Sequence, residues 1–309
     1  MIKTRGLART FTVRGRPVEA VAGIDLDVRP GELVGFLGPN GAGKTTTLRM
    51  LATLLRPTAG EAVVAGHDLR TDPAGVRGKI GYLGQGNGGG LDQRVRDEVM
   101  IQARIYRLAD PRARVTALLD EFELTDVADR LVGSLSGGQK RRLDVVLGVL
   151  HEPELIFLDE PSAGLDPASR DNLWQHVRSL RENRGATVFL TTHYLDEADA
   201  LCDRILVIDH GRIVAEGSPD ELKRRVSGDL VTLTVSDPAR AAARCPGATV
   251  TGDRIDFRVP RGDTALPGVL GDLGAVGITV TSIQTHRPTL DDVFLTVTGR
   301  SLREGSPDA

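Results

Sequence analysis

The chain has 309 residues, of which 40% are hydrophobic and 26% charged, with a formal net charge of -3. This length supports one large domain or two modest ones, and the near-neutral charge gives no indication of a nucleic-acid partner. The longest apolar runs, such as Val145 to Leu150, fall far short of the roughly 20 residues of a membrane helix, and Met1 to Phe11 lacks the apolar run of a secretory signal. We therefore expect a cytosolic protein that reaches a membrane only through a partner.

Short β-branched runs alternate with longer helical patterns up to about Val226, which predicts an α/β domain with a largely parallel core sheet. The segment Val18 to Val28 alternates apolar and polar residues, which is typical of a half-exposed strand in an antiparallel β subdomain. In contrast, Leu33 to Leu37 is apolar throughout, so it is expected to be a central strand covered on both faces. Helical periodicity without strand patterns from Asp92 to Leu131 predicts a helical insertion, with the helical subdomain spanning about 86–150.

Strand patterns resume after the insertion. They cover Leu155 to Leu158, Thr187 to Thr191, Arg204 to Ile208 and Arg212 to Ala215. A change in composition then divides the chain into a larger α/β domain, residues 1–226, and a smaller C-terminal α+β domain, residues 227–309. The second domain reads strand, helix, strand, strand, helix, strand from Leu230 to Ile283, which is the ferredoxin-like split βαβ order, and ends in a helix from Leu290 to Thr298.

The segment Gly38-Pro39-Asn40-Gly41-Ala42-Gly43-Lys44-Thr45 matches the P-loop pattern at every fixed position. It lies between the buried strand and a helix expected to start near Thr46, so backbone N–H groups and the helix dipole can converge on phosphates. Lys44 is expected to reach the β and γ phosphates of ATP, and the Thr45 hydroxyl to ligate Mg2+. A glycine-rich turn without a ligand is the alternative, and the strand and helix on either side argue against it.

Two carboxylates, Asp159 and Glu160, follow the apolar strand that starts at Leu155. Asp159 is expected to hold Mg2+ through its water shell, and Glu160 to act as the general base. Adjacent strand residues point to opposite faces, so both carboxylates can serve one site only if the strand breaks between them. Pro161 is expected to cause that break, because it restricts Glu160 to extended or turn conformations. On their own, two such acids are more often solvated turn residues.

The segment Leu135-Ser136-Gly137-Gly138-Gln139 precedes a helical run to about Leu150. Ser136 is predicted to be an N-cap, and the glycines after it leave the helix N-terminus open to a second anion. This sequence resembles the signature motif of the ATP-binding cassette (ABC) family of transporter ATPases. The resemblance covers residues 1 to about 226 and implies the P-loop ABC ATPase fold, with ATP and Mg2+ as cofactors.

The resemblance also implies roles for four residues outside these motifs. Phe11 matches an aromatic that stacks on adenine, and Gln85 a glutamine that touches Mg2+ or the attacking water and senses a transmembrane subunit. Asp166 lies in a segment, Ser162 to Asp166, that contacts the second subunit in the family, and His193 matches the switch histidine at the γ-phosphate. The plainer alternatives are a core phenylalanine, a turn glutamine, a helix-capping aspartate and a structural histidine.

A finer resemblance is to ATPases of the daunorubicin-resistance type of drug exporter. It is carried by Thr46 to Pro57, Gly66 to Asp68, Tyr194 to Asp199 and Leu290 to Thr296. It implies a homodimer that drives a separate integral-membrane permease from the cytoplasmic side of the membrane, with drugs or antibiotics as cargo. The alternatives are an ATPase of a polysaccharide, lipid or uptake transporter, and a soluble ABC ATPase acting on ribosomes or DNA. The single P-loop and the lack of a sustained heptad run argue against the last.

Overall fold

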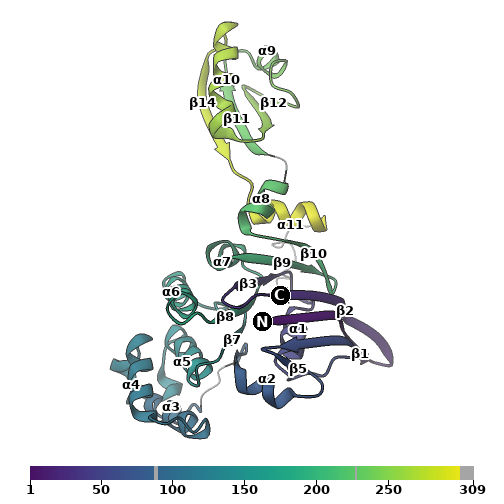
Figure 1. Cartoon of the computed structure of the whole chain (residues 1–309). Coiled ribbons are helices and arrows are strands. Elements are labelled where there is room, and N and C mark those ends of the chain that lie inside the picture. The colour runs from purple at the N-terminus through teal and green to yellow at the C-terminus, as the bar shows by residue number, and fades with distance from the viewer. Residues whose placement is uncertain (87–89, 227, 300–309) are drawn as a thin grey trace. The chain divides into compact units, whose positions relative to one another are not determined.

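The computed structural model describes residues 1–86, 90–226 and 228–299 (Figure 1). Contacts divide the chain between Ser218 and Pro219 into two compact units. The sequence placed the boundary after residue 226, whereas the contacts group helix α8 (Pro219–Arg225) with the second unit.

The first unit contains an antiparallel sheet with strand order β2-β1-β4-β5. The long hairpin of β1 and β2 confirms the antiparallel strand predicted from the alternating pattern of Val18 to Val28. The strands are β1 (Ile2–Val13), β2 (Arg16–Val28), β4 (Ala59–Val64) and β5 (His67–Asp68).

The second sheet of this unit has six strands in the order β10-β9-β3-β8-β7-β6, and all pairs are parallel except β9 with β10. Strand β3 lies inside the sheet, and all five of its residues are buried, as its uninterrupted apolar sequence predicts. The strands are β3 (Leu33–Leu37), β6 (Ile80–Leu83), β7 (Leu155–Asp159), β8 (Thr187–Thr192), β9 (Arg204–Asp209) and β10 (Arg212–Gly217).

One apolar core joins the two sheets through the first helix, α1. Leu48 of α1 is fully buried, and the rings of Phe36 and Phe189, on neighbouring strands, lie 5.5 Å apart between centroids. The loops that leave β3, β7 and β8 therefore meet at the carboxyl edge of a rigid sheet, where ligands of such sheets bind. The helices of this part are α1 (Lys44–Leu51), α2 (Pro73–Lys79), α6 (Pro167–Arg184) and α7 (Leu195–Leu201).

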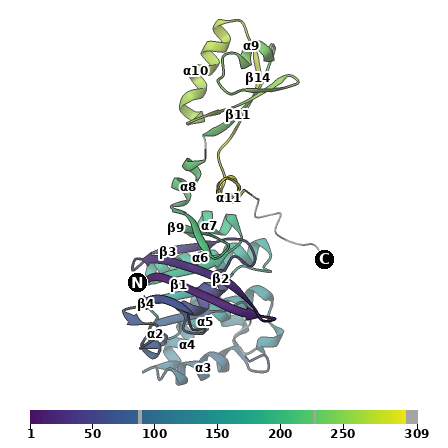
Figure 2. The same cartoon turned by 90° about the vertical axis from the view of Figure 1, so that its right-hand side faces the viewer.

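The predicted helical insertion is present as helices α3 (Val95–Ile105), α4 (Pro111–Glu121) and α5 (Gly137–Val149). They gather on the side of the six-stranded sheet away from the antiparallel sheet (Figures 1 and 2). Helix α5 packs against both α3 and α6, so it connects the insertion to the sheet domain. The fold class predicted from the sequence is thus confirmed for the first unit.

The second unit contains a four-stranded antiparallel sheet in the order β12-β13-β11-β14. Because β13 lies between β11 and β12, this is a split βαβ order, and alternate residues such as Val231, Leu233 and Phe257 form the core. Helices α8 and α11 pack together in the same unit. The remaining elements are β11 (Asp229–Val235), α9 (Pro238–Ala242), β12 (Thr249–Thr251), β13 (Arg254–Val259), α10 (Gly262–Ala275), β14 (Val280–His286) and α11 (Leu290–Thr298). No helix within the described ranges is long and apolar enough to span a membrane.

Candidate nucleotide site

The P-loop joins β3 to α1 and depends on glycines at two backbone positions. Gly41 and Gly43 have φ angles of 81° and 107°, and a Cβ on Gly43 would lie 2.5 Å from the carbonyl oxygen of Ala20. Gly43 is also the N-cap of α1, so the helix begins at Lys44, two residues before the predicted start. The loop borders a pocket of about 410 Å³ that Ala20, Gln85 and Glu160 also line.

The side chain of Lys44 is folded back over this loop. Its Nζ donates hydrogen bonds to the carbonyl oxygens of Gly38 and Pro39, at 2.7 and 3.1 Å, and lies 3.3 Å from Oε1 of Glu160. Burial lowers the pKa of Lys44, and the nearby Glu160 carboxylate opposes that shift. The ammonium group is therefore poorly solvated and could exchange these carbonyls for phosphate oxygens.

Three oxygen-bearing side chains meet beside Lys44. The Thr45 hydroxyl donates to Oδ1 of Asp159 at 2.9 Å, and Nε2 of Gln85 donates to the Thr45 hydroxyl at 3.3 Å. Asp159 is fully buried, and among the described residues its Oδ2 has no hydrogen-bond partner. A hydroxyl, a carboxylate with an unsatisfied oxygen and an amide oxygen match the hard-oxygen donors that Mg2+ prefers, so these residues fit that cation.

The carboxylate of Glu160 lies between Lys44 and His193. Its Oε2 lies 3.3 Å from Nδ1 of His193, and the pKa of Glu160 is lowered, mainly by this polar contact with His193 and further by the charge of Lys44, while burial opposes both. The carboxylate is therefore ionised at neutral pH, as a proton acceptor must be.

Strand β7 ends at Asp159, so the break lies between the two carboxylates, as the sequence predicts. Glu160 itself has a φ of 49°, in the left-handed region, and its N–H donates to the carbonyl oxygen of Thr191 at 3.0 Å. The Thr191 hydroxyl also donates to Oδ1 of Asp159, at 2.7 Å. The neighbouring strand β8 therefore holds a turn that the sequence of β7 does not specify by itself.

The other residues predicted from the sequence, Phe11, Ser136 and Asp166, lie apart from the residues described so far. Phe11, on β1, is partly buried beneath the Arg9 guanidinium, which lies 4.6 Å from the ring centroid. Its strand partner, Val18, precedes by two residues the Ala20 that lines the loop pocket. Phe11 is thus placed near the pocket but not in it.

The signature segment and Asp166 begin two helices. Ser136 and Gln139 form a capping box on α5, with the Ser136 Oγ accepting from the Gln139 N–H at 3.3 Å. Asp166 caps α6 by accepting from the Ser169 N–H at 3.0 Å. Within the described parts of this chain, neither Ser136 nor Asp166 hydrogen-bonds to the P-loop.

One residue that sequence reasoning missed is Arg141. It is buried in α5, and its guanidinium donates to backbone carbonyls next to both Gln85 and Glu160. The spacing of Arg141 and Asp144 at i and i+3 in α5 is the sequence feature that could have indicated a paired arginine at this position.

Two family models match the chain. The model described as "ABC transporter" matches residues 21–163, and that described as "ATP-binding protein DrrA1-3-like, C-terminal domain" matches residues 217–298. The chain is 45% identical to the daunorubicin resistance ATP-binding protein DrrA3 of Streptomyces coeruleorubidus, over 92% of this chain and 93% of that protein. It is 40% identical to the daunorubicin/doxorubicin resistance ATP-binding protein DrrA of Streptomyces peucetius, over 99% of this chain and 95% of that protein. A Nod factor export ATP-binding protein I of Burkholderia thailandensis is 37% identical, over 92% and 93%.

Solved structures match the cassette part of the chain. A dimeric post-hydrolysis structure of the ATP-binding cassette MJ0796 bound to ADP and Pi has 26% identity and a TM-score of 0.66, covering 71% of this chain and 98% of that one. A second dimeric MJ0796 structure has 27% identity and a TM-score of 0.65, and again covers 71% of this chain and 98% of that one. The chain is therefore an ATPase that belongs to the ABC transporter ATP-binding proteins of the DrrA daunorubicin and doxorubicin resistance family.

Proposed function

We propose that this chain is the ATP-hydrolysing subunit of a drug or antibiotic exporter. Two copies close around two ATP molecules and drive a separate integral-membrane permease from the cytoplasmic side of the membrane. The observation that carries this proposal is a hydrolytic cluster, Lys44 with Asp159, Glu160 and His193, in a chain where, among the described residues, Ser136 at the start of the signature helix makes no hydrogen bond to the P-loop.

The cluster supplies the groups that hydrolysis needs. Glu160 accepts a proton from the attacking water, whose oxygen bonds to the γ phosphorus while the bond to the ADP oxygen breaks. His193 and Gln85 orient the reactants, and Lys44 with the loop N–H groups stabilises the charge on the phosphate oxygens. Thr45, Gln85 and Asp159 would hold Mg2+, which when bound neutralises phosphate charge.

A second copy supplies the other phosphate-binding surface. The first turn of α5 has its N–H groups available beyond the Ser136 cap, and it has no side chains at Gly137 and Gly138. A Cβ on Gly138 would lie 2.6 Å from the Ser169 Oγ in α6, so glycine is also required for the packing behind the helix. The dimeric MJ0796 cassettes support this arrangement by likeness of fold.

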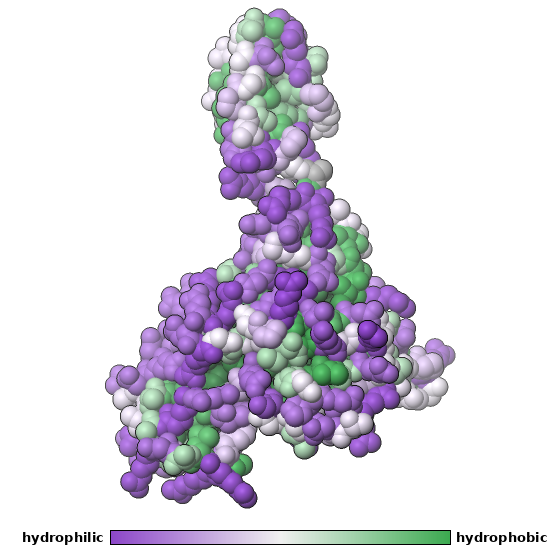
Figure 3. Space-filling model, in the orientation of Figure 1, coloured by the Kyte–Doolittle hydropathy of each residue, from purple (hydrophilic) through white to green (hydrophobic). Residues whose placement is uncertain are grey.

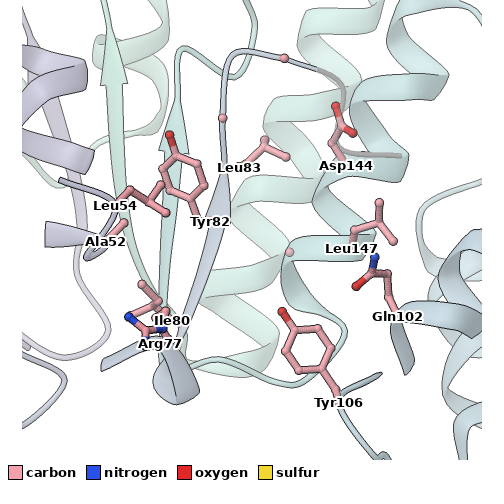
Figure 4. A pocket seen from close by; sticks show the side chains of 13 residues that line it. Ala52, Leu54, Arg77, Ile80, Tyr82, Leu83, Gln102, Tyr106, Asp144 and Leu147 are labelled. Atoms are coloured by element: carbon pink, nitrogen blue, oxygen red, sulfur yellow. The ribbon is translucent and has the colours of Figure 1, made fainter. Parts of the chain in front are cut away.

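The proposed permease contact is a pocket of about 320 Å³ bordered by β6, α3 and α5 (Figure 4). It is lined by Tyr82, Tyr106 and Leu147 and by Gly84 and Gly86, the neighbours of Gln85. Apolar side chains lie among hydrophilic ones on the adjoining helical subdomain (Figure 3), where 64% of Ile105 is exposed. Exposed apolar groups around a hollow favour a protein partner, and this hollow lies beside Gln85, which donates a hydrogen bond to Thr45 of the P-loop.

The export of drugs is tested with inside-out membrane vesicles that contain the chain and a candidate integral-membrane permease. ATP should drive accumulation of a fluorescent anthracycline such as daunorubicin, and vesicles with the Glu160→Gln variant should show none. ATP-dependent transport of only another cargo, or transport in the direction of uptake, would contradict the drug-export proposal and leave the ATPase assignment intact.

A further inference from the structure

Arg141 connects two separate segments of the hydrolytic site through backbone hydrogen bonds. Its Nη1 donates to the carbonyl oxygen of Gly84 at 2.8 Å, and its Nε to that of Pro161 at 2.6 Å. Its Nη2 donates to the carbonyl oxygens of Asp159 and Glu160, at 3.2 and 3.3 Å. One guanidinium therefore contacts the residue before Gln85 and three consecutive residues at the proposed base.

Arginine is suited to this position. The guanidinium has five N–H donors in a rigid planar fork, whereas a lysine ammonium is a single point with three. Arg141 is only 8% exposed, and its charge is balanced by Asp144, whose Oδ2 lies 3.8 Å from Nη1. Burying a cation in this way is costly unless its donors are satisfied, so the carbonyl contacts hold the side chain in one position.

Because Arg141 lies in α5, its contacts connect the start of this helix to the segments that carry Gln85 and Glu160. The helix begins at Gly137, so Arg141 follows the capped N-terminus, Ser136 to Gln139, by about one turn. A shift of that N-terminus must therefore move, or break from, the carbonyls beside Gln85 and Glu160. A non-glycine residue in the left-handed region, such as Glu160, is held there by the contacts around it, so loss of these carbonyl contacts would allow Glu160 to leave its position.

We propose that Arg141 is a positioning residue that fixes the signature helix to the segments carrying Gln85 and Glu160 of the same chain. The dimer part of this role rests on the proposed function, because only in a dimer does that helix complete the partner's ATP site. Arg141 then connects the hydrolytic groups at one ATP with the helix that binds the other. The hydrolysis part does not need the dimer to be observed.

The first test compares steady-state ATP hydrolysis of Arg141→Met and Arg142→Met. Arg142, the next residue of α5, donates instead to Oε2 of Glu123 at 2.9 Å and to Oδ1 of Asn172 at 2.6 Å. We expect Arg141→Met to lower kcat by about 10- to 100-fold with KM nearly unchanged, because misplaced groups slow the reaction without removing ATP contacts. Arg142→Met should keep kcat within about 3-fold of wild type.

A conservative variant, Arg141→Lys, separates a loss of positioning from a loss of folding. Arg141→Lys keeps a cation beside Asp144 but cannot reach both carbonyl segments, so it should fold and still lower kcat at unchanged KM. Its melting temperature is compared with that of Arg142→Met. The proposal is overturned if Arg141→Lys has wild-type kcat, or if the losses in the Arg141 and Arg142 variants are equal.

The second test adds each change to Glu160→Gln and measures the mass by light scattering at saturating Mg-ATP. Glu160→Gln alone and with Arg142→Met should be dimeric, whereas addition of Arg141→Met should give monomers that still bind ATP. A dimer in all three would overturn the connection between Arg141 and the partner site. If Glu160→Gln alone stays monomeric, the proposed function fails, and the kcat comparison still decides the role of Arg141 in hydrolysis.

Discussion

At the scale of single residues, Lys44 is the cation that we propose binds the phosphates of ATP. Its ammonium is bound by the carbonyl oxygens of Gly38 and Pro39 and by Glu160, all of which would have to release it to phosphate. Lys44→Ala should abolish hydrolysis and severely weaken ATP binding, as measured by calorimetric titration. Folding should persist, because the buried ammonium costs desolvation in the unliganded protein.

The matched control for this variant is Lys79→Ala. The Lys79 ammonium pairs with Glu154 on the surface, with 47% of the side chain exposed, away from the loop. Its ATP affinity and turnover should equal those of the wild type. Unchanged turnover in Lys44→Ala would contradict the assignment of the site.

The acidity of Glu160 predicts a change in the pH dependence of hydrolysis. The pKa of Glu160 is lowered chiefly by the contact with His193 and further by the charge of Lys44, while burial acts to raise it. His193→Ala removes the largest lowering influence and leaves burial, so the pKa rises. The base is active only when ionised, so the acidic limb of kcat/KM should move to higher pH.

Gln85→Ala is the control for the pH profile. It should lower the rate without moving the limb, because Gln85 donates to Thr45 rather than to Glu160. If the pH profiles of kcat/KM for the His193 and Gln85 variants differ only in their maximum and not in the pH of the acidic limb, His193 does not set the pKa of Glu160.

Some features of the site could be predicted from the sequence and others could not. Residues in fixed motifs, such as Lys44 and Asp159, can be selected by spacing, because a loop that cradles phosphate must take one local path, and the structure brings Asp159 against Thr45 of that loop. The left-handed turn at Glu160 and the carbonyl contacts of Arg141 depend on segments far away in the sequence. No local pattern encodes them.

At the scale of elements, Ser136 has two possible roles at the start of α5. As an N-cap it stabilises the helix, and as a partner-facing residue it would bind phosphate. Ser136→Ala should lower the stability by about 0.5–2 kcal/mol through loss of the cap. Ser136→Asp should keep the cap and the melting temperature, but its charge should repel phosphate and prevent ATP-dependent association. Association of the Asp variant as strong as that of wild type would limit Ser136 to capping.

Some strand limits can be predicted from the sequence, and others depend on tertiary contacts. Strand β3 occupies the predicted residues, because a run of buried apolar side chains is a local signal. The strand pattern of the second unit was expected to end at Ile283, whereas its last strand, β14, spans Val280–His286. Its limits follow from pairing with β11, where Ser282 lies opposite Thr234, and this register depends on tertiary contacts.

At the scale of the whole molecule, the two units predict how the chain tolerates truncation. Chains ending at Ser218 and at Val226 should both bind ATP, because the P-loop, Asp159, Glu160 and His193 all lie in the first unit. The shorter chain should be at least as stable, since α8 buries Leu222 and packs with α11 of the second unit. Melting temperature and ATP titration measure both properties. A chain ending at Ser218 that cannot fold or bind ATP would show that the units share one core.

The central claim is that ATP is held between two copies of this chain, and Glu160→Gln tests it most directly. The amide keeps the shape of the side chain but cannot take the proton, so hydrolysis should fall by about 100- to 10,000-fold while ATP stays bound. Light scattering with Mg-ATP should then give about twice the 33.1 kDa mass of one chain, and one chain's mass without it. Wild-type hydrolysis by this variant, or a monomer at saturating ATP, would contradict the account.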